Sequence, residues 1–244
     1  MAIALPRSAA RATLASRFSA PLVPYVSLLP LDTPSVPPVP LTSCRVTLRR
    51  QLKRRRRAYT PHQRQYASKR LAHRLQRCSL LRRARRLALY LPSSHEIDPT
   101  HLLGTLHRRG VEVYVPVLRP GTTPQLWFVR LTPETPLIVN RFGLLEPAAR
   151  YATCPRHRCP AWALDLVIVP LVGFDAQGGR MGMGGGYYDR TFAFTRHGGK
   201  RPTLLGVAFE HQRVTVLPLA PWDVPLDAIV TDQHVYENAR ATTR

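Results

Sequence analysis

The sequence contains no uninterrupted apolar stretch of the roughly 18 residues that a membrane-spanning helix needs. The longest candidate, residues 21–31, is broken by Pro24 and Pro30. Acidic residues are also scarce, with 14 Asp and Glu against 36 Lys and Arg in 244 residues and a formal net charge of +22. We therefore expect no membrane partner, and the charge favours anionic ligands such as nucleotides, phosphates or nucleic acid. A GC-rich gene is the other explanation for so much arginine.

Cysteine is scarce as well. The chain has Cys44, Cys78, Cys154 and Cys159, and no two of them form a Cys-x-x-Cys pair. A metal site built from Cys154, Cys159 and His157 would need a second ligand pair at a close spacing. We therefore favour free thiols, which fit a reducing compartment and a cytoplasmic protein.

Proline, by contrast, is abundant, with 24 residues, and it first gathers in residues 31–40. Residues 1–40 carry Arg7, Arg11 and Arg17, several serines, and no acidic residue before Asp32. Such a composition is typical of organelle-targeting segments, and a start site assigned too early in the gene is the alternative. In either case we expect residues 1–40 to be a disordered tail and residues 41–240 to form one domain.

The rest of the chain alternates between helix and strand patterns. Leu48 and Leu52 share one face of a basic helix over residues 45–57, and Thr60 with Pro61 begins a second helix that runs to about residue 78. We predict further helices at 99–109 and 187–197, and strands at 87–91, 111–115, 125–131, 166–171, 204–209 and 228–231. Residues 132–163 are proline-rich, and we expect this region to be less regular in structure. The alternation predicts an α/β fold, a mostly parallel sheet with helices on both faces in the Rossmann-like three-layer arrangement of sugar-phosphate isomerases and CoA-transferases.

The most informative stretch is residues 165–189, which reads DLVIVPLVGFDAQGGRMGMGGGYYD. An apolar strand ends at Pro170, at the sheet edge where open α/β folds bind ligands. Six glycines follow between residues 178 and 186, and glycine lets backbone N–H groups approach an anion closely. The loop lacks the Gly-Lys-Ser/Thr of a Walker A motif and is no strict G-x-G-x-x-G. We interpret it as a phosphate-binding loop, with a plain flexible connection as the alternative.

This stretch, together with motifs elsewhere, closely resembles the 5-formyltetrahydrofolate cyclo-ligase family, also called methenyltetrahydrofolate synthetases. The family pattern is Gly-Phe-Asp after a buried strand, then Arg-x-Gly-x-Gly-x-Gly-Tyr-Tyr-Asp, found here at residues 173–175 and 180–189. The other shared segments are Tyr90-Leu91-Pro92 with Glu96-Ile97-Asp98, Asn140-Arg141-Phe142-Gly143 with Glu146-Pro147, and Trp222-Asp223-Val224-Pro225-Leu226-Asp227. With the basic first helix, the resemblance covers residues 45–235.

The resemblance implies an ATP-dependent ring closure. The formyl oxygen on pterin nitrogen 5 attacks the γ-phosphate of ATP, an iminium phosphate forms, nitrogen 10 adds to it and phosphate leaves. The products are 5,10-methenyltetrahydrofolate, ADP and phosphate. Such chemistry asks the protein to position ATP and balance charge, and it needs no covalent catalytic residue.

The resemblance also implies roles for individual residues. The implied ATP-binding residues are Arg45, Arg49, Arg180, Met181, Gly182, Met183, Gly184, Gly185, Gly186, Tyr187 and Tyr188. The implied folate-binding residues are Leu91, Glu96, Phe142 and Tyr187, with residues 183–187 lining both sites. The implied Mg²⁺ ligands are Asp189 and Asp227, although Asp189 could instead simply complement the dipole of a helix.

The chain departs from the family pattern at four of these positions. Arg45 stands where relatives often have Lys. Met183 and Gly185 stand where some relatives have a cation, so phosphate charge must be balanced from elsewhere, by Arg180 or the first helix. Phe142 stands where some relatives have Trp; it either stacks on the folate or packs in the core.

The rival interpretation is a basic nucleic-acid-binding protein, supported by the charge and by the arginine run at residues 54–57. No aromatic residues interleave with that run and no groove-reading motif is present. We therefore expect 5-formyltetrahydrofolate and ATP as partners, no nucleic acid, and a monomer.

Overall fold

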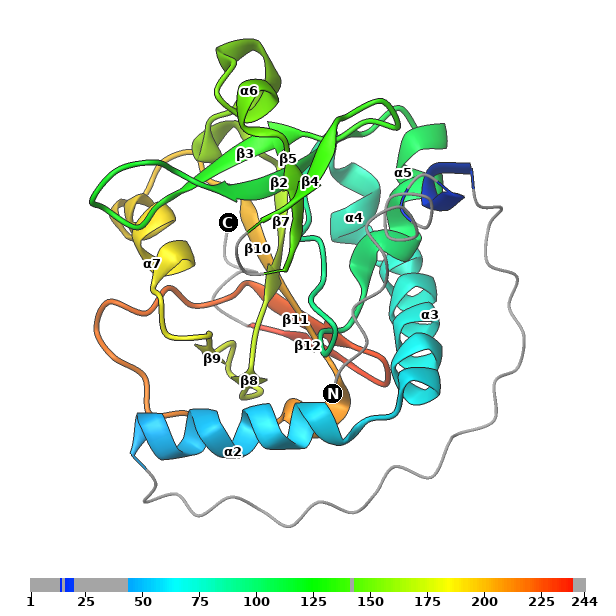
Figure 1. Cartoon of the computed structure of the whole chain (residues 1–244). Helices are drawn as coiled ribbons and strands as arrows, with labels where there is room; N and C mark the ends of the chain where they lie inside the picture. Colours follow the sequence, from blue (N-terminus) through cyan, green and yellow to red (C-terminus); the bar gives the residue numbers. More distant parts are fainter. Residues whose placement is uncertain (1–13, 15, 20–43, 141–142, 239–244) are drawn as a thin grey trace.

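The computed structural model describes residues 14, 16–19, 44–140 and 143–238 (Figure 1). Its centre is an eight-stranded sheet with the order β12-β11-β10-β7-β1-β2-β3-β6. The strands are β1 (Arg86–Ala88), β2 (Glu112–Leu118), β3 (Leu126–Arg130), β6 (Arg158–Cys159), β7 (Leu166–Pro170), β10 (Thr203–Ala208), β11 (Ala228–Thr231) and β12 (Val235–Glu237). The five strands from β11 to β2 are parallel, and β12, β3 and β6 add antiparallel edges. The predicted mostly parallel sheet is confirmed.

Both faces of the sheet are covered, as the apolar run in β7 predicts. Leu166 and Ile168 point into one apolar cluster, and Val167 and Val169 point into another. The first cluster packs against α3 (Pro61–Arg77), α4 (Ser79–Arg83), the 3₁₀ turn η1 (Pro99–Leu102) and α5 (Leu103–Arg108). The second packs against the end of α7 (Tyr187–Thr191), the 3₁₀ turns η3 (Ala161–Ala163) and η4 (Ala193–His197), and the loop before β11. Alternating side chains thus anchor the strand on both sides.

The basic helix α2 (Arg45–Ala58) crosses one end of the molecule, beside the short hairpin of β8 (Gly173–Phe174) and β9 (Arg180–Met181) (Figure 1). Leu48 and Leu52 are buried there against Val172 and Met181. Gly173 is required at this contact, since a Cβ would lie 2.4 Å from a methyl carbon of Leu52. The predicted start of α3 is also confirmed: Thr60 and the residue three positions on form a capping box.

Other parts of the chain differ from the sequence expectation. The predicted helix at 187–197 is a five-residue α-helix followed by a 3₁₀ turn. The proline-rich region holds a hairpin of β4 (Leu137–Val139) and β5 (Leu145–Pro147), then α6 (Ala149–Ala152) and the 3₁₀ turn η2 (Pro155–His157). None of the helices in the described ranges is long and apolar enough to cross a membrane.

Part of the N-terminal segment docks on the fold, so the expectation of a wholly undocked tail is wrong for residues 14 and 16–19. These residues are helical, and Leu14 and Phe18 are buried in the first apolar cluster. The Phe18 ring meets His107 edge to face, and Arg17 donates to Asp98 at 3.2 Å. The other residues of the predicted tail lie outside the described part of the chain.

We predict that Phe18→Ala lowers the melting temperature. Removing a buried ring at the edge of a core costs about 1–3 kcal/mol, which is a shift of roughly 3–10 °C in a domain of this size. Differential scanning calorimetry measures it, with the exposed Ser19→Ala as the matched control. An unchanged melting temperature would mean that the segment contributes nothing to the fold.

His211 gives the fold a pH dependence. It lies in the 3₁₀ turn η5 (Glu210–Gln212), with its ring centroid 4.1 Å from that of Tyr59 and 5.4 Å from that of Phe209. Burial, together with nearby Arg55, lowers the pKa of His211 to about 4. The folded state therefore disfavours the protonated ring, and stability is lost as the pH falls from about 6.5 toward 4.

We predict that His211→Phe removes part of this acid sensitivity. Between pH 7 and pH 5 the wild type should lose about 1–2 kcal/mol more unfolding free energy than the variant, because only its unfolded state takes up this proton. Urea unfolding at the two pH values measures the difference. Equal losses in both proteins would show that His211 titrates normally in the fold.

Candidate active site

A cavity of about 1060 Å³ opens at the carboxyl edge of the parallel strands, where β1 and β7 run into its wall. Besides residues of β2, β3 and the end of β7, five parts of the chain line it. They are α2 (Arg45, Arg49), the segment after β1 (Tyr90, Leu91, Ser93, Glu96), the β4–β5 hairpin (Asn140, Leu144, Leu145, Glu146), the glycine loop with α7 and η4 (Arg180, residues 182–190, Ala193, Arg196), and Trp222 with Asp223. This is the edge at which open α/β sheets bind ligands.

The glycine loop depends on glycine at several positions. Gly184 and Gly186 have φ angles of +108° and +66°, which other residues rarely adopt. A Cβ on Gly186 would lie 2.6 Å from the guanidinium of Arg190, and one on Gly185 would lie 2.9 Å from the ring of Tyr187. The loop therefore packs its backbone directly against side chains of the helix that follows. Because α7 is only five residues long, its dipole contributes less to anion binding than the sequence suggested.

Two arginines of the cavity are paired with carboxylates. Arg45 donates to Asp223 at 2.5 and 3.1 Å, and Arg180 donates to Asp189 at 2.5 Å. The hydrogen bond to Asp223 raises the pKa of Arg45. Burial alone would raise the pKa of Asp223, but the hydrogen bonds from Arg45 and the Ala220 N–H bring it below its ordinary value. The pair of Arg45 and Asp223 therefore stays charged near neutral pH.

Three further arginines of the cavity are held by backbone carbonyls instead. Arg49 donates to Gly182 at 3.0 Å, Arg190 to Gly185 at 2.7 Å, and Arg196 to Trp222 at 2.7 Å. None of the three has a carboxylate within salt-bridge distance among the described residues. A carbonyl orients a guanidinium without neutralising it, so these charges are available to an anion in the cavity.

Glu96 is a further carboxylate that lines the cavity. One of its oxygens accepts from Arg56 at 3.3 Å and the other from the Ser93 N–H at 2.9 Å. Beside it, Tyr90 donates to the Ile97 carbonyl at 2.6 Å, and burial raises the pKa of the Tyr90 hydroxyl well above its ordinary value. This wall thus presents a fixed anion in a largely apolar surrounding.

The structure brings most of the predicted residues to one cavity. Arg45, Arg49, Leu91, Glu96, Arg180, Gly182, Met183, Gly184, Gly185, Gly186, Tyr187, Tyr188 and Asp189 all line it. Met181 does not line it; its side chain is buried against α2. Phe142 lies outside the described residues, so its two interpretations stay open.

Asp227 is the clear difference from the predicted site. Its carboxylate accepts from Arg201 at 2.6 and 2.8 Å and from the Leu204 N–H at 2.8 Å, at the amino end of β11. The cavity lies at the carboxyl edge of the same parallel strands, and Asp227 does not line it. The structure therefore does not bring Asp189 and Asp227 together. The residue that approaches Asp189 is Val224, whose N–H donates to it at 3.1 Å, directly after Asp223.

Several residues of the cavity received no role from the sequence. They are Asn140, Glu146, Arg190, Arg196, Trp222 and Asp223. Four of them stand in segments shared with the cyclo-ligases, and that position was the one sign in the sequence that they belong to the site. Asn140 donates to Glu146 at 2.9 Å across the β4–β5 hairpin, and Trp222 is 64% exposed at the rim. Their partners are distant in sequence or across a turn, so only the fold shows the contacts.

Comparison with known proteins identifies the family of this chain. The model of the 5-formyltetrahydrofolate cyclo-ligase family matches residues 42–232. The chain is 38% identical over 186 residues to the 5-formyltetrahydrofolate cyclo-ligase of Escherichia coli (strain K12), covering 76% of this chain and 99% of that protein. It is 40% identical over 145 residues to the enzyme of that name from Haemophilus influenzae, covering 59% of this chain and 74% of the relative.

Solved structures show the same fold. The NMR structure of Aquifex aeolicus 5,10-methenyltetrahydrofolate synthetase matches with a TM-score of 0.67 at 27% identity, covering 80% of this chain and 93% of that one. The 5,10-methenyltetrahydrofolate synthetase of Mycoplasma pneumoniae matches with a TM-score of 0.59 at 21% identity, covering 78% and 99%. At that lower identity the likeness concerns the fold alone.

We predict that Asp227→Asn acts on stability. It removes charge-assisted hydrogen bonds to Arg201, whose pKa is raised by that same contact, and should lower the unfolding free energy by about 1–3 kcal/mol. Urea unfolding measures the loss, and the Mg²⁺ dependence of any activity should not change. A variant of normal stability with a shifted Mg²⁺ dependence would instead return Asp227 to the site.

Proposed function

The chain belongs to the 5-formyltetrahydrofolate cyclo-ligase family and is an enzyme of that activity, and we propose that it converts 5-formyltetrahydrofolate to 5,10-methenyltetrahydrofolate with ATP in the cavity described above. One observation carries the use of ATP: three guanidiniums with no carboxylate partner among the described residues line the same cavity as a glycine loop, at the carboxyl edge of a parallel sheet. A triphosphate is the anion that such a set of donors fits.

The two walls of the cavity suit two different ligands. The wall of Arg49, Arg190 and the glycine loop offers cations and backbone N–H groups, and we assign it to the phosphates of ATP. The wall of Leu91 and Glu96 offers apolar surface and a carboxylate, which can accept hydrogen bonds from the N–H groups of a pterin ring. A cavity of about 1060 Å³ lies at the upper end of the usual range for ligand sites, which supports two substrates side by side.

The reaction follows from this placement. The formyl oxygen on nitrogen 5 attacks the γ-phosphorus, and the bond from that phosphorus to the bridging oxygen breaks to release ADP. The formyl carbon is then an iminium carrying a phosphate. Nitrogen 10 adds to that carbon with loss of its proton, the carbon–oxygen bond breaks, phosphate leaves, and the methenyl bridge is complete. Phosphorylation is needed because the oxygen of an amide is otherwise a poor leaving group.

The protein's task in this sequence is positioning and charge balance. Glu96, held by two partners, fixes the pterin so that the formyl oxygen faces the glycine loop. Arg49 and Arg190 lie beside the loop that surrounds the transferring phosphoryl group, where negative charge must be balanced. No covalent catalytic residue takes part. We expect the enzyme to be a monomer and to work in the cytoplasm.

Mg²⁺ fits the donor set in one particular way. Within the described ranges no three His, Cys, Asp or Glu side chains are grouped so as to hold a metal by themselves. In nucleotide sites, however, Mg²⁺ is held by one or two carboxylates together with phosphates and water. Asp189, which lines the cavity, would hold the ion, with Asp223 as the neighbouring carboxylate. The bound ion would balance phosphate charge.

The nucleic-acid alternative loses its main support in the fold. Arg45, Arg49 and Arg56 of the basic helix face the interior and contact other parts of the chain. Only part of the arginine run is exposed, including Arg54 and Arg57. The helix therefore lines the cavity with several of its arginines, and only the remaining ones form an exposed basic surface.

The test is formation of the methenyl product, followed by its absorbance, from 5-formyltetrahydrofolate, ATP and Mg²⁺. We predict that Arg49→Gln raises the KM for ATP about tenfold to a hundredfold, because it removes a charge-assisted contact worth roughly 1.5–3 kcal/mol. Arg54→Gln, an exposed position on the same helix, is the matched control and should change little.

Product formation without ATP would contradict the proposal. Equal effects of the two variants would indicate a diffuse basic patch. In that case, salt-sensitive binding to duplex DNA, weakened equally by both, would favour the nucleic-acid alternative.

A further inference from the structure

We propose that Arg56 is a positioning residue for folate: it holds Glu96 in place and links that carboxylate to the glycine loop. The inference rests on the proposed function, since it takes Glu96 as the group that receives the pterin. Arg56 does not line the cavity, and the family pattern described above gives it no role.

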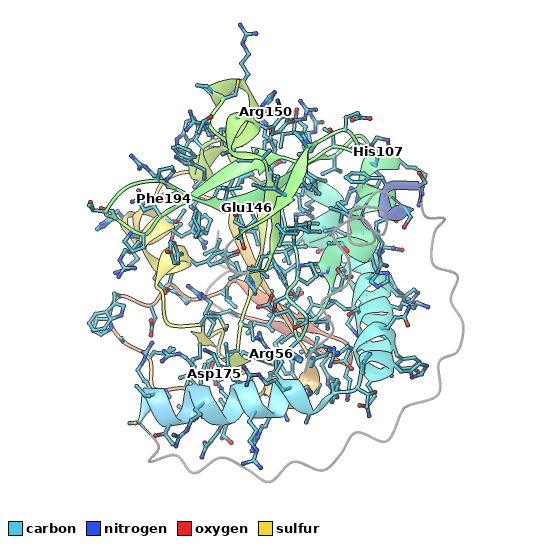
Figure 2. All side chains as sticks on the ribbon, viewed as in Figure 1. Arg56, His107, Glu146, Arg150, Asp175 and Phe194 are labelled. Carbon is cyan, nitrogen blue, oxygen red and sulfur yellow. The ribbon has the colours of Figure 1, made fainter. Side chains whose placement is uncertain are left out.

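The side chain of Arg56 is placed for this task. The residue is only 5% exposed, and in Figure 2 it lies on the inward side of α2, facing the sheet. Its Nη1 donates to Glu96 Oε1 at 3.3 Å, and its Nη2 lies 3.9 Å from the sulfur of Met183 in the glycine loop. The Arg56 guanidinium thus contacts Glu96 on one wall and Met183 on the other without itself lining the cavity.

Glu96 has two anchors of different kinds. Oε2 accepts from the Ser93 N–H at 2.9 Å, a contact within its own loop, whereas Oε1 is held by Arg56 from 40 positions earlier in the chain. Two anchors fix the plane of the carboxylate, and each oxygen keeps a lone pair for a further donor in the cavity. Without Arg56 the carboxylate would keep one anchor and could rotate away from the pterin.

Arg56 is also the only cation within salt-bridge distance of Glu96 among the described residues. The carboxylate is 14% exposed, so little water reaches it in compensation. An anion in such surroundings that loses its partner either draws in water or moves toward solvent. Either change displaces the acceptor that the pterin is expected to meet.

The spacing of the helix explains why one element can serve both substrates. Arg45, Arg49 and Arg56 are 4 and 7 residues apart, and at 100° per residue they fall on one side of α2. The first two reach the ATP wall, and the third reaches Glu96 about two turns further on. Arg57, one position later, is exposed and provides a matched control.

The experiment measures binding of 5-formyltetrahydrofolate to the full chain by isothermal titration calorimetry without ATP. Arg56→Met should weaken this binding about tenfold or more and change the KM for ATP less than about twofold. Arg57→Met should change neither. Loss of ATP affinity to the same extent as folate affinity would overturn the proposal, because it would mean a general disturbance of the helix.

A double-mutant cycle with Glu96→Gln separates positioning from mere structural support. If Arg56 acts through Glu96, adding Arg56→Met to Glu96→Gln should weaken folate binding by less than about twofold more. If the double variant binds folate more weakly by the full product of the two single-variant factors, the proposal is overturned. Arg56→Lys is measured in parallel, because lysine keeps the positive charge but lacks the planar, two-pronged guanidinium. It should weaken folate binding about threefold or more when Glu96 is present, and should have no further effect in the Glu96→Gln variant. Arg56→Lys can therefore take the place of Arg56→Met in the double-mutant cycle if Arg56→Met does not fold. Failure of the wild-type chain to bind 5-formyltetrahydrofolate would count against the proposed function itself.

Discussion

Arginine side chains from one face of α2 hold together walls that come from distant parts of the sequence. Arg45 binds Asp223, Arg49 binds the glycine loop, and Arg56 binds Glu96. Between these contacts Leu48 and Leu52 are buried against the segment that follows β7. The apolar stripe fixes the helix on the carboxyl edge of the sheet, and the guanidiniums then fix the loops that surround the cavity. Both kinds of contact thus support the walls of the cavity.

The distribution of charge in the cavity matters more than the net charge of +22. Two arginines are neutralised by Asp189 and Asp223, whereas Arg49, Arg190 and Arg196 are oriented by carbonyl oxygens and keep their charge. Cations that are already oriented need little reorganisation when an anion binds, and in a partly enclosed site they act more strongly than in water. On the proposed function, arginines on α2, α7 and η4 would balance the phosphate charge that Met183 and Gly185 cannot.

The positions of two aspartates illustrate a constraint that parallel sheets impose. Asp189 follows the loop after β7 and lies at the carboxyl edge, whereas Asp227 directly precedes β11 and lies at the amino end. Consecutive parallel strands begin at one edge of the sheet and end at the other, so a residue that precedes one strand and a residue that follows another lie at different edges. A carboxylate at the amino end finds its partner there, and Asp227 pairs with Arg201 just before β10.

The sequence alone determined the local features, because each depends on neighbours in the chain. The alternation of apolar runs predicted the parallel sheet, Thr60 and Pro61 predicted the start of α3, and the glycines predicted a loop at the sheet edge where ligands bind. It could not determine which arginine of a basic run faces inward, since Arg54, Arg56 and Arg57 differ only in the direction that α2 takes across the sheet. It also could not show that Phe18 docks, or that Arg190 bonds a backbone carbonyl and has no carboxylate partner in the described part of the chain. Those outcomes depend on contacts between segments far apart in the chain, which only the packed tertiary structure decides.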